Sequence, residues 1–306
     1  MILCIGEALM EFRRSSSNGA LATPGVWDGP FPSGAPAIFA SVAARLGAPT
    51  ALAASVGDDR FGRELLARLH RDGVQSEAIR TDPRRATAVA FVAYEPSGDR
   101  DFWFSVHDSA AVEIDLAAVE RVSARADWLH VSGSTVGFGG APAMAVEAAA
   151  ERILRGGGTL SVDPNLRPDG PAEARDRIVR LARAARVLFP SDGELEALGL
   201  VAEELVARGA LICHTRGRDG AVLQGGSVGA DCVTVGVPPV EEVDATGAGD
   251  TFAAAFVTAL RDGADPVSAA DFGCRTAARS VAVLGAMEAP VAPLVILDNL
   301  TNDSRH

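Results

Sequence analysis

The chain has 306 residues, 48% of them hydrophobic, so it is long enough to bury a substantial core and is not a disordered protein. Its formal net charge of −12 argues against a nucleic-acid-binding protein, because such proteins neutralise phosphates with clustered Lys and Arg. Residues 1–7 have no basic leader and predict a first strand in place of a signal peptide. Because no long charge-free apolar stretch follows, the chain is expected to be cytoplasmic, without a membrane partner.

Short apolar runs alternate with amphipathic helical segments from about residue 36 onward. This alternation predicts an α/β fold with a mostly parallel sheet and helices on both sides. Expected helices include 60–72 and 142–155. The expected strands are 50–56, 127–131, 158–163, 186–189 and 210–214.

Two segments interrupt this rhythm. Residues 12–32 carry Gly, Pro and Ser without a helical period, and residues 86–106 predict a β-hairpin with a turn at 95–99. Two β excursions from a doubly wound core predict a small sheet that covers the site as a lid. With no linker between independent domains, the sequence predicts one domain over 1–306 with a lid formed by about 12–32 and 86–106.

Cysteine and histidine give no sign of a metal site. The cysteines are far apart, which predicts buried thiols rather than disulfides: Cys4, Cys213, Cys232 and Cys274. His70 and His130 have no acidic partner nearby in sequence, and no two histidines have ligand spacing. Both are interpreted as structural.

The run 244–250, Asp-Ala-Thr-Gly-Ala-Gly-Asp, precedes a good helical segment. Small residues at the start of a helix let phosphate oxygens reach unpaired backbone N–H groups. A carboxylate there would repel phosphate, but it can take a proton from a hydroxyl that attacks a γ-phosphate. We therefore predict Asp250 as the catalytic base and Gly247, Ala248 and Gly249 as the phosphate-binding turn. The alternative is that Asp250 only caps a helix.

This run resembles the C-terminal signature of the ribokinase-like (PfkB) carbohydrate kinases. Gly6-Glu7 and the stretches 33–47 and 56–62 resemble other parts of that family, so the likeness covers nearly the whole chain. The resemblance implies a doubly wound, mostly parallel central sheet flanked by helices, with a small β-sheet lid. It implies ATP and Mg²⁺ as cofactors, and it leaves open a K⁺ ion near Asp244 and a homodimer formed through the lid.

Several polar positions take sugar-binding roles from the same resemblance. Asp163, Asn165 and Arg167 follow a strand at its carboxyl end, where open α/β sheets bind ligands. Together with Glu11 and Gly34, they are predicted to bind the sugar. The alternative for 163–167 is a polar turn in which Asp163 caps the next helix.

The remaining predicted residues concern the nucleotide and its metal. The resemblance assigns the nucleotide to a strand–turn–strand that carries Thr215, Gly217 and Gly220, although the pattern alone is an ordinary hairpin. It assigns Glu194 to Mg²⁺ through water, which suits an ion that keeps its own waters. The alternative for Glu194 is a favourable carboxylate in the first turn of a helix.

The identity of the sugar does not follow from the sequence. Glu11 stands where fructokinases usually carry Asp and looks more like 2-keto-3-deoxygluconate kinases, which favours a keto-sugar acid slightly over fructose. Arg167 could pair with the carboxylate of such an acid. Three residues depart from the family pattern in the sugar and base pockets: Ser33, Ile38 and Cys274.

The sequence is compatible with three function classes to different degrees. The leading one is transfer of the γ-phosphate of ATP to a hydroxyl of a small sugar or keto-sugar acid. A non-catalytic sugar or nucleotide sensor with the same fold is the alternative that the altered Ile38 and Cys274 would support. A Rossmann oxidoreductase is disfavoured, because no Gly-x-Gly-x-x-Gly turn follows the first strand.

Overall fold

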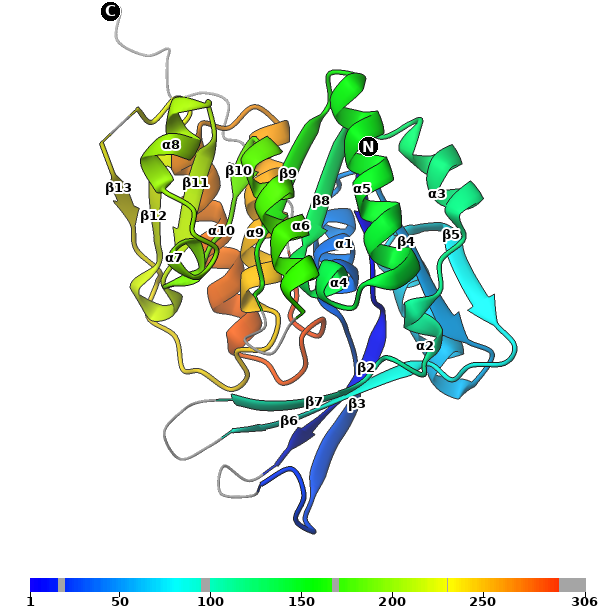
Figure 1. Ribbon diagram of the computed structural model, residues 1–306. Coiled ribbons are helices and arrows are strands. Elements are labelled where there is room, and N and C mark those ends of the chain that lie inside the picture. The colour runs from blue at the N-terminus through cyan, green and yellow to red at the C-terminus, as the bar shows by residue number, and fades with distance from the viewer. Residues whose placement is uncertain (16–19, 95–99, 167–170, 230, 292–306) are drawn as a thin grey trace, which may run out of the picture.

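The computed structural model of the protein describes residues 1–15, 20–94, 100–166, 171–229 and 231–291. Its centre is a nine-stranded sheet in the order β13-β12-β11-β10-β9-β8-β1-β4-β5 (Figure 1). The strands from β5 to β11 run parallel, and β12 and β13 are antiparallel additions at one edge. The strands are β1 (Ile2–Ile5), β4 (Thr50–Gly57), β5 (Gln75–Asp82), β8 (Trp128–Ser132), β9 (Thr159–Asp163), β10 (Val187–Leu188), β11 (Leu211–Thr215), β12 (Ala221–Gly225) and β13 (Val233–Val235).

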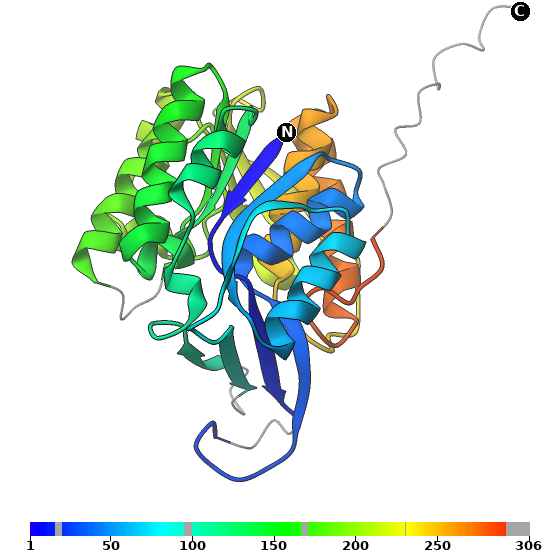
Figure 2. The same cartoon turned by 90° about the vertical axis from the view of Figure 1, so that its right-hand side faces the viewer.

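Helices cover both faces of this sheet, as the two views in Figures 1 and 2 show. One face carries α1 (Ala35–Arg45), α2 (Arg60–Arg71), α9 (Ala248–Arg261) and α10 (Pro266–Val281). The other carries α3 (Leu116–Ser123), α4 (Gly133–Gly137), α5 (Gly140–Arg155), α6 (Ala172–Ala184), α7 (Glu194–Ala197) and α8 (Ala202–Ala207).

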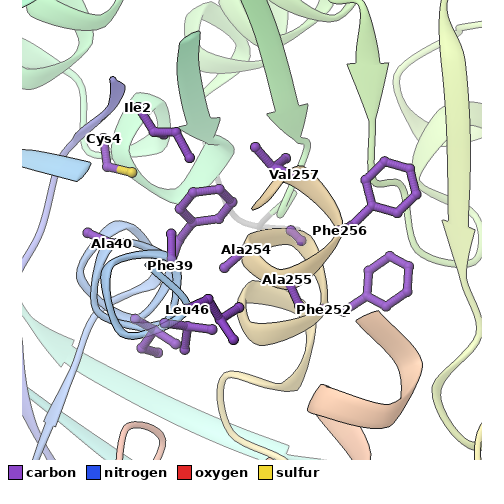
Figure 3. Close-up of a cluster of buried hydrophobic side chains, with 14 of the residues drawn as sticks. Ile2, Cys4, Phe39, Ala40, Leu46, Phe252, Ala254, Ala255, Phe256 and Val257 are labelled. Carbon is purple, nitrogen blue, oxygen red and sulfur yellow. The ribbon is translucent and has the colours of Figure 1, made fainter. Parts of the chain in front are cut away.

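The period-2 alternation of a strand explains why two separate cores form. In β1, Ile2 and Cys4 join the core under α1 and α9, whereas Leu3 and Ile5 join the core under α3 and α5. Figure 3 shows the first of these cores, where Phe39 of α1 lies between β1 and α9. Burial on both faces accounts for the continuous apolar runs that predicted these strands.

A second sheet has four strands in the order β3-β2-β6-β7: β2 (Leu9–Arg14), β3 (Trp27–Ser33), β6 (Ala88–Tyr94) and β7 (Arg100–Ser105). It lies beyond one end of the central sheet (Figures 1 and 2). Its first strand begins at Leu9, earlier than the predicted stretch 12–32, because the chain re-enters extended structure directly after β1. The predicted turn at 95–99 lies outside the described residues.

The predicted fold class is confirmed, and each predicted strand and helix of the core is present. The strand expected at 186–189 is shorter, because only Val187 and Leu188 pair with β9 and β11. Three cysteines are buried as expected, but Cys232 is exposed, so its prediction was wrong. Within the described ranges, no helix is both long and apolar enough to span a bilayer.

Candidate active site

A cavity of about 420 Å³ lies where parallel strands of the central sheet end. Glu7 follows β1, Asp163 ends β9, Ser191 follows β10 and Thr215 ends β11, and all four line the cavity. The second sheet supplies further lining through Leu9, Glu11, Ser33, Phe102 and Phe104. The order of the strands reverses at β1, because β4 and β5 lie on one side of it and β8 and β9 on the other. Open α/β sheets bind ligands at such a reversal point, beyond the carboxyl ends of the strands, and the cavity lies there.

The start of α9 forms one wall of this cavity. Gly247 caps the helix in the left-handed region, with φ of 73°, and its carbonyl accepts the N–H of Thr251 at 2.9 Å. A Cβ at Gly249 would meet no atom within 4 Å, so the first turn of α9 is open to the cavity. First-turn N–H groups have no intrahelical acceptor, and the helix dipole favours an anion there. Asp250 lies in the same turn and lines the cavity.

Asp244 holds this turn in place from behind. Its side chain is buried; Oδ1 accepts the N–H of Thr246 at 3.1 Å and Oδ2 accepts the N–H of Gly285 at 3.0 Å. Asp244 is not among the residues that line the cavity. Its carboxylate therefore joins the turn 244–250 to the segment that follows α10.

Glu11 and Ser33 meet on the second sheet. Both side chains are buried, and Ser33 Oγ donates to Glu11 Oε2 at 3.1 Å. Gly34 follows with φ of 107°, and a Cβ there would stand 2.6 Å from the carbonyl oxygen of Glu7. This close approach requires glycine and brings the Glu7 and Glu11 segments together. Ile38 of α1 adds an apolar patch to the same wall.

A buried chain of hydrogen bonds, which was not predicted from the sequence, continues from Glu7. Ser134 Oγ donates to Glu7 Oε1 at 2.7 Å and Thr135 Oγ1 donates to Oε2 at 2.8 Å. Ser134 Oγ lies 2.8 Å from Ser132 Oγ, which accepts from Asn165 Nδ2 at 3.1 Å. The signal in the sequence was Glu7 itself, a carboxylate directly after an apolar strand, where burial demands hydrogen-bond partners.

Asp163 and Glu194 organise the loops after β9 and β10. Asp163 Oδ1 accepts the N–H of Asn165 at 2.9 Å, and helix α6 begins later with Pro171 as its N-cap. The alternative that Asp163 caps the next helix is therefore wrong. Glu194 Oε1 accepts the N–H of Leu166 at 2.6 Å, and Oε2 accepts the N–H of Ser191 at 2.8 Å. Arg167, the remaining predicted residue of this loop, lies outside the described residues.

The far end of the cavity is lined by the predicted strand–turn–strand. Thr215 ends β11, and the short helix η2 (Gly217–Asp219) leads through Gly220 into β12, which pairs antiparallel with β11. Val237, Cys274 and Ala277 complete this end with apolar surface. Burial raises the pKa of Cys274 to about 11, so its thiol is not a nucleophile near neutral pH.

Aromatic side chains of β7 lie on both faces of the second sheet. Phe102 and Phe104 stack with ring centroids 5.6 Å apart and line the cavity. Trp103 between them points to the other face, where it contacts Phe91 at 5.7 Å and is 54% exposed. Phe102 was not identified from the sequence.

The predicted structural role of the two histidines agrees with their surroundings. His130 is buried and stacks on Phe39 with centroids 3.8 Å apart, while its Nδ1 lies 2.9 Å from Ser161 Oγ. Burial lowers the pKa of His130 to about 3, so the ring is neutral in the folded protein. His70 is exposed on α2, and neither ring lines the cavity.

Residues 1–292 match the pfkB family of carbohydrate kinases. The chain belongs to this family. It is 33% identical over 273 residues to fructokinase-2 of Solanum lycopersicum, an alignment that covers 86% of this chain and 82% of the relative. As a member of the pfkB family, it is a carbohydrate kinase, an enzyme that transfers a phosphoryl group to an alcohol group.

Solved structures agree with this assignment. An E. coli protein described as ribokinase II, in complex with ATP and Mg²⁺, superposes with a TM-score of 0.86 at 33% identity and covers 95% of this chain and 96% of its own. Fructokinase from Vibrio cholerae, with fructose, ADP and calcium bound, superposes with a TM-score of 0.78 at 26% identity and covers 94% of each chain.

Proposed function

We propose that this pfkB kinase transfers the γ-phosphate of ATP to a primary hydroxyl of a small neutral sugar, with a ketohexose such as fructose as the leading candidate. One observation carries the proposal: the open first turn of α9 and the Asp250 carboxylate lie in the same cavity as the carboxylate of Glu11. The α9 turn would hold the phosphate, Glu11 would accept a sugar hydroxyl, and Asp250 would act between them.

The reaction follows from this arrangement. The acceptor hydroxyl attacks the γ-phosphorus, the bond from that phosphorus to the β,γ-bridging oxygen breaks, and ADP leaves. The proton of the hydroxyl goes to the Asp250 carboxylate, and the N–H groups at the start of α9 stabilise the charge on the transferring group. Gly247, Ala248 and Gly249 keep that approach free of bulky side chains.

We propose that ATP lies between the α9 turn and the strand–turn–strand of Thr215, Gly217 and Gly220. This end of the cavity has small or apolar lining, which suits a base and ribose. Acidic side chains but no Lys or Arg lie among the described residues around the cavity, and every basic residue of the chain apart from histidine is an arginine. Backbone N–H groups at the start of α9 and a divalent cation would help to neutralise the phosphates.

The residues present fit a weakly held Mg²⁺. Among the described residues, no three acidic, cysteine or histidine side chains gather into a metal site, so most ligands would be phosphate and water oxygens. Glu194 lines the cavity, and its oxygens already accept two backbone N–H groups, which suits contact through water. Bound Mg²⁺ would offset the negative charge that develops on the phosphates. We propose that a K⁺ ion bound near Asp244 activates the enzyme, which is tested by measuring activity as the KCl concentration is varied.

The charge of the cavity favours a neutral sugar over a keto-sugar acid. A substrate carboxylate would enter a space already lined by Glu7, Glu11, Asp163 and Asp250, and like charges at close range are unfavourable. Carboxylates are instead good acceptors for sugar hydroxyls. The relatives named fructokinases support the same choice. Arg167 is the residue that would have to pair with an acid.

An ADP-release assay over neutral ketoses, aldoses and keto-sugar acids tests the proposal, with Mg²⁺ present or removed by EDTA. We expect turnover of a ketose that needs the metal. Preference for 2-keto-3-deoxygluconate, with a rise in its KM in Arg167→Gln, would shift the assignment to a sugar acid. Turnover of no sugar in the panel would contradict the proposal and favour a binding role.

We further propose that the second sheet acts as a lid and that its outer face joins two copies of the chain. On that face Trp27 and Trp103 both contact Phe91, at 5.2 and 5.7 Å between ring centroids, and Trp103 is half exposed. Such an exposed aromatic group is typical of a protein interface. Trp103→Glu should convert a dimer to a monomer in analytical ultracentrifugation; a wild-type protein that is already monomeric would contradict the assembly.

A further inference from the structure

The chain after α10 returns to the active site as a short buried segment, residues 285–289, here named the C-terminal strap. Ala286, Met287 and Ala289 of the strap are buried. A Cβ at Gly285 would stand 2.7 Å from Phe31 Cδ1 of the second sheet, and a Cβ at Gly247 would stand 3.2 Å from Ala286 Cβ. The strap therefore packs against both the lid and the turn that caps α9.

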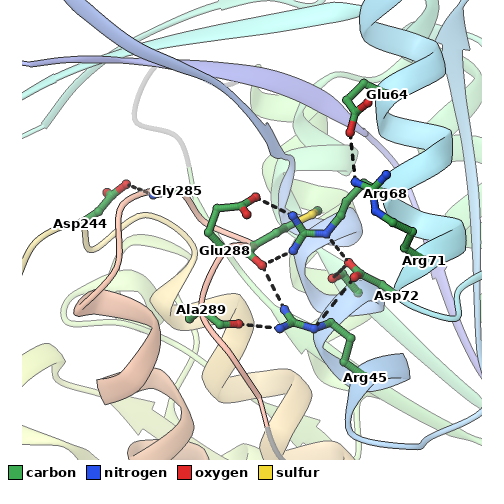
Figure 4. Close-up of polar contacts among 11 residues, drawn as sticks. Arg45, Glu64, Arg68, Arg71, Asp72, Asp244, Gly285, Glu288 and Ala289 are labelled. Carbon is green, nitrogen blue, oxygen red and sulfur yellow. Dashed lines mark hydrogen bonds and ion pairs between the residues drawn. The ribbon is translucent and has the colours of Figure 1, made fainter.

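Two arginines, one from α1 and one from α2, hold the strap by its backbone (Figure 4). Arg45 at the end of α1 donates to the carbonyl oxygens of Met287 at 3.0 Å and Ala289 at 2.6 Å. Arg68 of α2 donates to the same Met287 carbonyl and pairs with Glu288 Oε1 at 2.5 Å. Both arginine side chains are mostly buried, at 19% and 11% exposed.

Asp72 orients these two guanidinium groups. Its Oδ2 accepts from Arg68 Nε at 2.9 Å and from Ser41 Oγ at 2.5 Å, and its Oδ1 lies 4.0 Å from Arg45 Nε. Asp72 is itself almost fully buried, so the carboxylate and the two cations are fixed relative to one another. A planar guanidinium with several donors suits this geometry, because one arginine can contact a carbonyl and a carboxylate at once.

The strap transmits this fixed position to the phosphate-binding turn. Gly285 N–H donates to Asp244 Oδ2, and the other oxygen of the same carboxylate accepts the N–H of Thr246, the residue before Gly247. Asp244 N–H and Val243 N–H both donate to the Val281 carbonyl, at 3.0 and 2.7 Å. Displacement of the strap would therefore move the start of α9 through two hydrogen bonds and through the contact between Ala286 and Gly247.

We propose that Arg45 and Arg68 are positioning residues for phosphoryl transfer: they clamp the C-terminal strap, and the strap, through Gly285 and Asp244, holds the Gly247–Asp250 turn in its productive place. The proposal rests on the function assigned above to that turn. It differs from a purely structural role because a loosened clamp would shift the turn relative to the acceptor hydroxyl while the central sheet stays folded.

Arg68→Gln tests the proposal, with Arg71→Gln on the same helix as the matched control. Arg71 pairs only with Glu64 at 3.0 Å among the interactions described, and both of these side chains are more than half exposed. Because small misplacement of reacting groups can lower rates by orders of magnitude, Arg68→Gln is expected to lower kcat about tenfold with the KM of the sugar within about twofold. Arg71→Gln should behave as wild type, and Arg68→Lys should be intermediate.

Hydrogen–deuterium exchange gives a readout that does not depend on turnover. In Arg68→Gln, amides of 285–289 and of 244–250 should exchange faster than in wild type, while those of β8 and β9 keep their protection. If 285–289 loosens but 244–250 and kcat do not change, the positioning role is wrong. Equal effects in Arg71→Gln would also contradict it.

Two further measurements keep the result interpretable. If Arg68→Gln fails to fold, Glu288→Gln removes only the ion pair to the strap, and it should show the same exchange pattern with a smaller loss of kcat. A wild-type protein inactive on every sugar would contradict the proposed function, but the exchange comparison would still decide whether the clamp holds the turn. Unchanged exchange in both variants would overturn the inference.

Discussion

Ile38 packs directly against Gly247: a Cβ placed on the glycine would stand 2.9 Å from Ile38 Cδ1. The contact joins a residue of α1 that lines the cavity to the residue that caps α9. An isoleucine side chain neither donates nor accepts a hydrogen bond, so Ile38 adds only apolar surface to the cavity. Its side chain closes the space beside Gly247, so a change at Ile38 should be felt at the turn that is proposed to bind phosphate.

Two glycines of this turn should therefore fail in different ways when they are substituted. Gly247→Ala introduces a side chain at positive φ against Ile38 and Ala286, and should lower the free energy of unfolding by about 1–2 kcal/mol while it reduces activity. A Cβ at Gly249 meets no neighbour within 4 Å, so Gly249→Val should fold normally, yet its side chain should block the approach of phosphate to the helix N–H groups. Thermal unfolding with ATP titration separates the two; unchanged kinetics in Gly249→Val would locate the phosphates elsewhere.

Asp250→Asn should keep the fold and the binding of ATP but lose the proton acceptor. General-base catalysis contributes ~10²–10⁴-fold, so kcat should fall by about that factor. Asp262→Asn is the control, because Asp262 is exposed at the other end of the same helix and does not line the cavity. Single-turnover rates measured with saturating ATP check the prediction, and near-normal turnover in Asp250→Asn would reduce that residue to a helix-terminal carboxylate.

Glu11→Gln should weaken binding of the sugar more than it slows the chemical step. Hydrogen bonds to a charged group are worth about 1.5–3 kcal/mol, so the KM of the sugar should rise about tenfold or more with kcat nearly unchanged. Ser33→Ala removes the hydroxyl that donates to Glu11 but leaves the carboxylate, and should have a smaller effect. A loss confined to kcat would argue that Glu11 does not contact the sugar in its ground state.

Much of the fold could be predicted because each core element carries a local signal. The strands of the central sheet are short apolar runs between helices with one apolar face, such as α2, where Leu65 and Leu69 are buried. The run 244–250 combined small residues with a carboxylate, and this local pattern was enough to predict the start of α9. The second sheet was predicted in part. Residues 86–106 were predicted as a hairpin, which β6 and β7 form. Residues 12–32 were predicted only as a β excursion, because β3 carries Gly29, Pro30 and Pro32 and has no clear period.

The interactions between distant segments could not be predicted from one sequence. The Glu7, Ser134 and Asn165 network joins three strand ends that are far apart along the chain. The hydrogen bond from Arg45 to Ala289 joins residues that are 244 positions apart along the chain. Neither has a local pattern, since an arginine that binds a buried carbonyl looks in sequence like any arginine at the end of a helix.

The buried histidine gives a prediction on stability that is independent of the active site. His130 has a folded pKa of about 3, whereas an unfolded histidine titrates near 6.5, so the unfolded state binds the extra proton between these values. Stability from this residue is complete above about pH 6.5 and is lost as the pH falls.

His130→Phe should retain stacking on Phe39 but remove the titration, at the cost of the contact with Ser161. Below the unfolded pKa, the free energy of unfolding falls by about 1.36 kcal/mol for each pH unit. Between pH 7 and pH 5 the free energy of unfolding of wild type should therefore fall by about 2 kcal/mol more than that of His130→Phe. Urea unfolding at several pH values measures this difference, with exposed His70→Gln as the control that should follow wild type. Parallel pH curves for wild type and His130→Phe would mean that His130 gains its proton in the folded protein, which its burial against Phe39 and Ser161 disfavours.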